Sequence, residues 1–127
     1  MNDGNIAPAK DHTVWRRFFY AAAIFNFLIG LAGMLVPEST LDGRIIGVLV
    51  LAFGVIYWLV ARDPVRFAPV LWAGVIGKLG VVGLLGPQTF MGGGEPILLV
   101  VLAGDLLFAL GFLAYLFNRD DADAEVI

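Results

Sequence analysis

Four long apolar runs constrain this chain more than any other feature of its sequence. They extend from Phe18 to Val36, from Ile45 to Ala61, from about Val65 to Gly86, and from Pro96 to Phe117. A helix needs about 20 largely apolar residues to cross the hydrocarbon core of a bilayer, and each run approaches or reaches that length. Because backbone groups in lipid must bond one another, continuous runs favour helices over the alternating strands of a membrane barrel.

The composition agrees with a membrane rather than an aqueous surrounding. The chain is 60% hydrophobic and 15% charged, against about 45–50% and about 25% in a typical soluble domain. We therefore predict an all-α integral membrane protein, a four-transmembrane-helix up-down-up-down bundle in contact with a lipid bilayer. Its expected segments are an N-terminal cytoplasmic segment at 1–14, the four-helix domain at 15–117 and an acidic cytoplasmic tail at 118–127.

Local signals indicate where the helices begin and end. Asp63 followed by Pro64 predicts a capped start for the third helix. Residues 88–94, with three consecutive glycines, are expected to form a flexible loop. The second helix has three candidate N-caps, Ser39, Thr40 and Asp42.

The distribution of Lys and Arg predicts the orientation. One side of the membrane carries only Arg44, whereas the side of both termini carries Lys10, Arg16, Arg17, Arg62, Arg66 and Arg119. The positive-inside rule then places both termini in the cytoplasm of a bacterium, with the chain in its cytoplasmic (inner) membrane. The first run is too long for a signal peptide and lacks a cleavage site, so we expect it to remain as a span.

A shift of 50 residues partly superimposes the sequence on itself. The matches include Arg16/Arg66, Ala23/Ala73, Gly30/Gly80, Gly33/Gly83, Pro37/Pro87, Gly43/Gly93 and Gly54/Gly104. The shift contains an even number of helices, so it predicts two hairpins related by an axis along the membrane normal, as in parallel transporter repeats. Chance matching in a chain rich in Gly, Leu and Val is the alternative.

Many of the 16 glycines fall inside the predicted helices. Small residues spaced by three, four or seven positions let helix backbones approach closely in lipid. We expect them to pack within one bundle, with contact in a homo-oligomer as a compatible alternative. The main sets are Gly30 and Gly33, Gly47 and Gly54, Gly74, Gly77, Gly80 and Gly83, and Gly104 and Gly111.

Three polar side chains, Asn26, Lys78 and Asp105, interrupt three of the apolar runs. At the helical rise per residue they lie roughly 15, 12 and 14 Å from the outer ends of their helices. A charge at the bilayer centre is costly and usually pairs inside a bundle. We predict a Lys78–Asp105 ion pair with a further hydrogen bond from Asn26. The alternative is that Lys78 reaches outward along its stem, leaving Asp105 protonated or bonded to Asn26.

Four further residues are secondary candidates. Arg44 lies at the outer surface with Glu38, where a solvated helix end is the more common interpretation and a gate or an ion pair is the alternative. Tyr57, beside Trp58, is typical of an interfacial aromatic. Arg62 and Arg66 flank a capped cytoplasmic turn, where their charge follows the positive-inside rule or contacts lipid headgroups.

The sequence carries no constellation typical of an enzyme. It has no cysteine, a single histidine, His12, and a single serine, Ser39. These counts exclude thiolate metal sites, bis-histidine haem ligation within the chain and an evident catalytic triad. We therefore expect no enzyme, no metal and no cofactor. The basic residues are scattered, so we expect no nucleic acid as a partner.

The layout from Arg16 to Phe117 resembles the small bacterial four-helix membrane proteins of the DoxX-like kind. The resemblance rests on loose motifs: Asn26 with Gly30 and Pro37, Gly54 with Tyr57, Asp63-Pro64, Gly77-Lys78 and Asp105-Leu106. It implies a fold and no catalytic residue, because members of that group are mostly uncharacterised.

Two functions are consistent with these patterns. In the first, the cluster of Asn26, Lys78 and Asp105 binds or translocates a small solute or a proton. In the second, the chain is a non-catalytic accessory or scaffold subunit of a larger membrane complex, and the cluster fixes helix register. A cavity that reaches the cluster would favour the first. A closed pair, with a glycine face left towards lipid, would favour the second.

Overall fold

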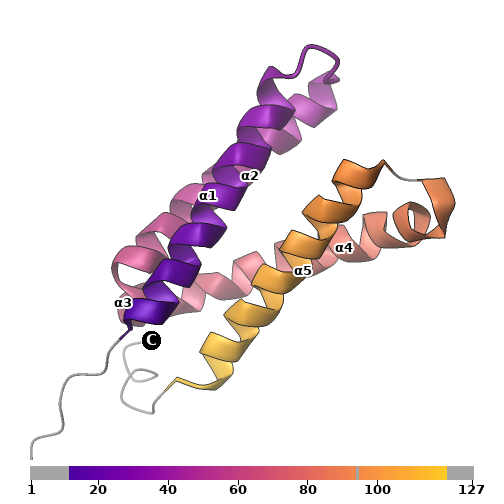
Figure 1. The fold of residues 1–127 in the computed structure, drawn as a ribbon. Coiled ribbons are helices and arrows are strands. Elements are labelled where there is room, and N and C mark those ends of the chain that lie inside the picture. The colour runs from indigo at the N-terminus through magenta and orange to yellow at the C-terminus, as the bar shows by residue number, and fades with distance from the viewer. Residues whose placement is uncertain (1–11, 94, 120–127) are drawn as a thin grey trace, which may run out of the picture.

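The computed structural model describes residues 12–93 and 95–119, and helices make up nearly all of this part of the chain (Figure 1). The long helices are α1 (Thr13–Leu35), α2 (Leu41–Arg62), α4 (Leu71–Gln88) and α5 (Pro96–Phe117). The short elements are α3 (Pro64–Phe67), the 3₁₀ turn η2 (Ala68–Val70) and the π-helical segment η3 (Thr89–Gly93). Four helices are long and apolar enough to cross a membrane, which confirms the predicted fold class.

The predicted helix starts agree with the structure. Thr40 caps α2, because its Oγ1 accepts a hydrogen bond from the Gly43 N–H at 3.0 Å. Asp63 caps α3, where its Oδ1 accepts from the Arg66 N–H at 3.3 Å and Pro64 follows as the first helical residue. The third span is nevertheless divided into α3, η2 and α4. Pro69 lies at the break, and its nitrogen has no hydrogen to donate to the helical ladder.

The prediction of a loop at 88–94 is wrong for the first residues of that range. The helix continues past Pro87 to Gln88 and through Thr89 and Phe90, and the backbone leaves the helical region at Met91. The Thr89 N–H donates to the carbonyls of Leu85 and Gly86, which carries the backbone ladder past the proline. The helical conformation is lost near Gly92, whose φ of 105° lies in the left-handed region that favours glycine.

The first hairpin is held together by glycine contacts. A Cβ atom added to Gly30 would lie 2.7 Å from the Leu51 nitrogen and 2.8 Å from the Gly47 carbonyl oxygen. An added Cβ at Gly47 would likewise lie 2.7 Å from the Gly30 oxygen. These neighbours are backbone atoms that cannot move aside, so α1 and α2 pack against each other at a distance that only glycine permits.

The second hairpin does not repeat this packing. An added Cβ at Gly77, Gly80 or Gly83 would meet no atom within 4 Å, so the expectation of tight packing within the bundle is wrong for these three residues. Gly80 and Gly83 match Gly30 and Gly33 in the 50-residue shift, yet only the first-hairpin pair is in close contact. Elsewhere the expectation holds: Gly104 and Gly111 of α5 receive the rings of Phe25 and Phe18 from α1.

Aromatic rings join the two hairpins at one end of the molecule. Phe19 lies 5.1 Å from Tyr115, and Tyr57 lies 4.9 Å from Phe112, measured between ring centroids. Towards the other end, the hairpin of α1 and α2 diverges from that of α4 and α5 (Figure 1). The molecule is therefore wedge-shaped: aromatic packing holds the hairpins together at one end, and their helices diverge towards the other.

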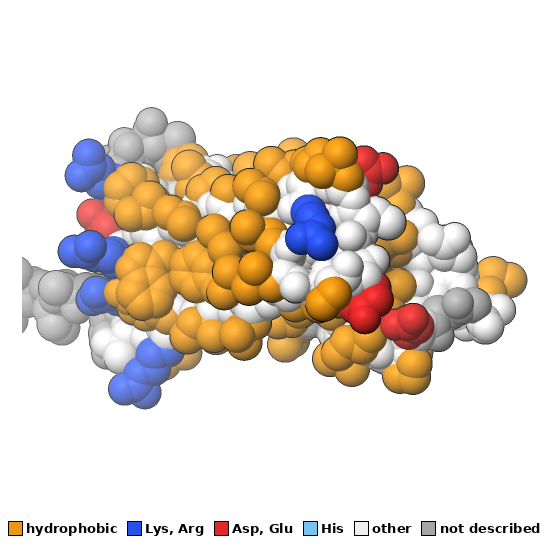
Figure 2. Space-filling view, turned by 90° about the horizontal axis from the view of Figure 1, so that it is seen from above, with side chains coloured by type: hydrophobic (Ala, Val, Ile, Leu, Met, Phe, Trp, Pro, Cys, Tyr) orange, Lys and Arg blue, Asp and Glu red, His pale blue; other side chains and the backbone are white. Residues whose placement is uncertain are grey.

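The surface separates charge from hydrocarbon. Figure 2 shows basic side chains gathered at the end where α1 begins, with a broad hydrophobic face beyond them. Many large apolar side chains on this surface are exposed, for example Leu28, Ile76 and Leu84. Such a surface suits lipid and not water. The expectations for Lys10, for most of 1–14 and for the acidic tail after Arg119 concern residues outside the described part of the chain.

Candidate functional site

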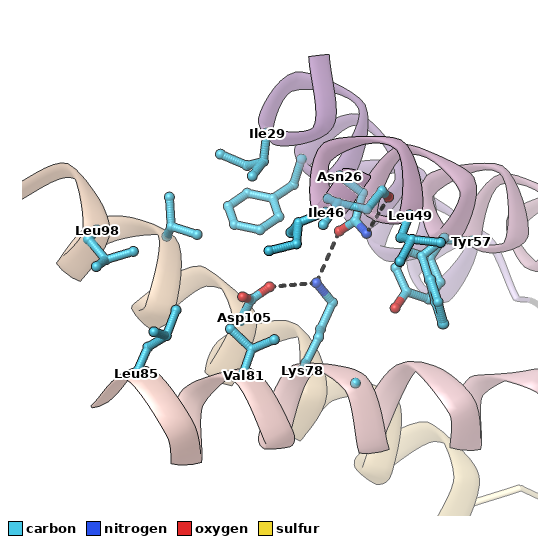
Figure 3. A pocket seen from close by; sticks show the side chains of 15 residues that line it. Asn26, Ile29, Ile46, Leu49, Tyr57, Lys78, Val81, Leu85, Leu98 and Asp105 are labelled. Carbon is cyan, nitrogen blue, oxygen red and sulfur yellow. Dashed lines mark hydrogen bonds and ion pairs between the residues drawn. The ribbon is translucent and has the colours of Figure 1, made fainter. Parts of the chain in front are cut away.

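Lys78 is the centre of a polar cluster inside the wedge (Figure 3). Its side chain projects from α4 and is 6% exposed. The Nζ atom donates to Asp105 Oδ1 on α5 at 2.8 Å and to Asn26 Oδ1 on α1 at 3.0 Å. The predicted ion pair and its amide partner are therefore confirmed as contacts. The alternative, in which Lys78 reaches outward, is wrong because two acceptors hold the ammonium group inside.

Asn26 fixes the cluster to the first hairpin. Its Nδ2 atom donates to the Val50 carbonyl of α2 at 3.0 Å, while its Oδ1 atom receives Lys78. The amide thus bonds two other helices at once, and it is 5% exposed. Because Lys78 belongs to the second hairpin, the Lys78–Asn26 bond ties the two hairpins together near the middle of the span.

Three aromatic rings surround the ammonium group of Lys78. Its Nζ lies 5.2 Å from the centroid of Phe25, 5.5 Å from Tyr57 and 5.7 Å from Phe108. A cation at this distance from a ring face is attracted by the ring quadrupole. The rings therefore stabilise the charge of Lys78 where it is buried.

A cavity of about 390 Å³ lies beside this cluster, between the two hairpins. All four long helices line it (Figure 3). Its polar lining comes from four residues, Asn26, Tyr57, Lys78 and Asp105, and its other lining residues are hydrocarbon or glycine. On each helix the apolar lining extends from the cluster towards the diverging ends, so the polar residues form the inner end of the cavity.

Tyr57 differs from its predicted role. It is 1% exposed and not interfacial, and its ring lies between Lys78 and the aromatic packing that joins the hairpins. An added Cβ at Gly74 would lie 2.7 Å from the Tyr57 hydroxyl oxygen, so a glycine of α4 makes room for this ring. The tyrosine therefore belongs to the site.

The secondary arginines lie away from the cluster. Arg44 is exposed and donates to the Met34 carbonyl at 3.0 Å, where it satisfies the C-terminal end of α1. Arg62 and Arg66 are exposed at the opposite end of the molecule, and Arg66 lies over the Phe67 ring at 5.3 Å. The structure brings none of these three to the cavity.

Two residues of the site, Phe25 and Phe108, are not among those predicted from the sequence. Phe108 follows Asp105 by three residues, so both occupy one face of α5. Phe25 precedes Asn26 directly, and its ring packs closely on Gly104, where an added Cβ would lie 2.6 Å from the ring. The spacing of Phe108 was a usable signal, whereas the position of Phe25 depends on how α1 packs on α5.

The fold and the site together define a class: a four-helix membrane protein with a buried ion pair at the inner end of an apolar cavity. No protein-family description, curated protein or solved structure matches this chain. In the described residues, no group of three or more His, Cys, Asp or Glu side chains is arranged to hold a metal ion.

Proposed function

We propose that this protein binds a small solute in the cavity between its hairpins, with the polar end of the solute against Asn26, Lys78 and Asp105. One observation carries the proposal: the cavity reaches both members of a buried ion pair. Intramembrane ionisable groups are costly and usually mark a binding or transport site. At about 390 Å³, the cavity falls within the usual range for small-molecule sites.

The cluster retains unused hydrogen-bonding capacity on its cavity side. An ammonium group has three N–H donors, and Lys78 uses two of them within the described residues. Asp105 accepts through Oδ1, its Oδ2 has no hydrogen bond to any residue that the structure describes, and its side chain is 14% exposed. A bound polar group would therefore find a donor and an acceptor side by side.

Binding is better supported than translocation. Tyr57 and Phe112 lie between the cluster and the basic end of the molecule, together with buried Phe19 and Leu71. This packing closes the route past Lys78. Translocation of a solute or a proton would require the hairpins to separate at their aromatic end.

A scaffold role is the second candidate function, because the outer surface of α4 carries exposed glycines. Gly77, Gly80 and Gly83 are exposed, with no side chain near the position of a Cβ. Such a face accommodates a neighbouring helix of a homo-oligomer or of another subunit. In this reading, the Lys78–Asp105 pair fixes the register of α4 and α5 and binds no solute.

The proposal also covers the membrane in which the protein resides and its orientation there. The basic side chains of the described chain lie mainly at the end where α1 begins and α5 ends. The positive-inside rule then supports a bacterial inner-membrane protein with both termini in the cytoplasm. Membership of the DoxX-like group rests on the sequence motifs alone.

Photolabelling of the full chain in proteoliposomes tests the binding proposal. Three probes share one alkyl chain with a diazirine and differ in the head: hydroxyl, carboxylate or trimethylammonium. We expect saturable labelling of Val101, which lines the cavity, by at least one probe. Leu84 is 81% exposed and lies outside the cavity, so its labelling should rise without saturation.

The matched control replaces the ion pair by apolar residues of similar volume, Lys78→Met with Asp105→Leu. Such replacements commonly preserve folding, so this variant should fold but lose the saturable part of the labelling at Val101. If no probe labels the cavity residues saturably in the natural chain, solute binding is wrong and the scaffold role stands.

A further inference from the structure

We infer that the solute is an electrically neutral amphiphile that enters the cavity sideways from the lipid, between α2 and α4. This inference rests on the proposed binding function and names its ligand class and its route. It combines three observations: the charge balance of the cluster, the apolar lining of the cavity and the position of its opening.

The charge balance excludes a strong preference for a charged head. Lys78 and Asp105 neutralise each other at 2.8 Å, and among the described residues no other charged side chain lines the cavity. A charged ligand would leave one uncompensated charge in a place of low polarity, which is costly. A neutral head such as a hydroxyl can accept from Lys78 and donate to Asp105 without disturbing the pair.

The lining of the cavity specifies the rest of the ligand. Beyond the cluster, the walls consist of Ile, Leu, Val, Phe and glycine, for example Ile29, Leu85 and Leu98. A fully polar solute would find no partners along these walls. An apolar body with a single polar head matches both parts of the site, with the head at the inner end.

The opening of the cavity faces lipid between α2 and α4. On that side the lining residues Ile46, Leu49 and Val81 are 59%, 56% and 41% exposed. On the side of α1 and α5, by contrast, the lining residues Phe25 and Val101 are half-buried. Because the exposed rim is apolar and belongs to membrane spans, hydrocarbon and not water borders the opening.

Gly77 lies at this opening. It lines the cavity, is exposed and has no atom within 4 Å of an added Cβ. It is one helical turn from Val81, so both face the same side of α4. Because Gly77 lines the cavity and an added Cβ there is in open space, a larger side chain at this position can be used to obstruct the opening. Gly83 is equally open but lies outside the cavity, which makes it a matched control.

The head-group preference is tested with the three photoprobes described above. We expect the hydroxyl probe to saturate the labelling of Val101 at a concentration about tenfold lower than the concentration that either charged probe requires. A Kd ratio of that size is readily resolved. If the carboxylate or trimethylammonium probe saturates first, the neutral-ligand inference is wrong while solute binding stands. If no probe saturates, the binding function itself fails.

The route is tested with Gly77→Leu against Gly83→Leu. Leucine is a better helix former than glycine, so both variants should fold at least as well as the natural chain. We expect saturable hydroxyl-probe labelling of Val101 to fall about tenfold in Gly77→Leu and to be unchanged in Gly83→Leu. Equal labelling in the two variants would show that the ligand does not pass between α2 and α4.

Discussion

At the scale of single residues, Lys78 is held from several sides. It combines an ion pair, an amide acceptor and three aromatic rings in a largely apolar interior. The sequence predicts its polar partners, because helical rise places Asn26, Lys78 and Asp105 at one depth. It does not predict the rings of Phe25 and Tyr57, which depend on helix rotation and packing.

The coupling within the ion pair can be measured by thermal unfolding. Lys78→Met or Asp105→Leu alone leaves one buried partner without its counter-charge, and each should lower the free energy of unfolding by about 3–5 kcal/mol. The double variant should recover most of that loss, because apolar residues then face each other. Additive losses would show that Lys78 and Asp105 are independent and contradict the geometry of the pair.

At the scale of helices, glycine determines how closely two spans approach. The glycine pattern predicts close contacts for α1 and α2, where Gly30 and Gly47 meet backbone to backbone. The same pattern fails for α4, because spacing along one helix does not specify which neighbour, if any, covers that face. Similarly, the glycines at 92–94 support a loop at 88–94, but the helical backbone continues through the first residues of that range and ends at Met91.

Gly30→Ala and Gly80→Ala form a matched pair, since the two positions correspond in the 50-residue shift. An alanine at position 30 collides with backbone atoms of α2 and should destabilise the protein by about 1–3 kcal/mol, as overpacking does. At position 80 it meets nothing within 4 Å and should be neutral or stabilising by up to about 1 kcal/mol. Thermal unfolding in one detergent compares the two.

A loss of stability in Gly80→Ala equal to that in Gly30→Ala would mean that the α4 face is covered in the assembled protein. That outcome would favour the scaffold role, because a neighbouring helix would then occupy the space that is open in the single chain.

At the scale of the whole molecule, the two hairpins form a wedge around the polar cluster. The four spans and their order follow from the apolar runs. The divergence of the hairpins and the cavity between them do not, because apolar side chains that face a cavity and those that face lipid have the same composition. The site is therefore predictable as a set of three polar residues, but not as a cavity with a lateral opening.

The orientation of the wedge is testable because the chain has no natural cysteine. Glu38→Cys lies in the connection between α1 and α2, and Arg62→Cys lies at the opposite end of α2. In intact bacterial cells with a permeable outer membrane, a membrane-impermeant maleimide should label position 38. It should label position 62 only after the inner membrane is disrupted. The reverse labelling pattern would show that the protein has the opposite topology.

The central claim is that the cavity binds a ligand whose head contacts the Lys78–Asp105 pair. The most direct measurement is the melting temperature of the purified full chain with decanol, compared with decane, for the natural protein and for the Lys78→Met, Asp105→Leu double variant. A ligand that binds the folded state raises this temperature as its concentration exceeds Kd. Decanol should therefore stabilise the natural protein more than decane does, and this difference should vanish in the double variant. Equal effects of decanol on both proteins, or no decanol-specific effect on either, would contradict the account.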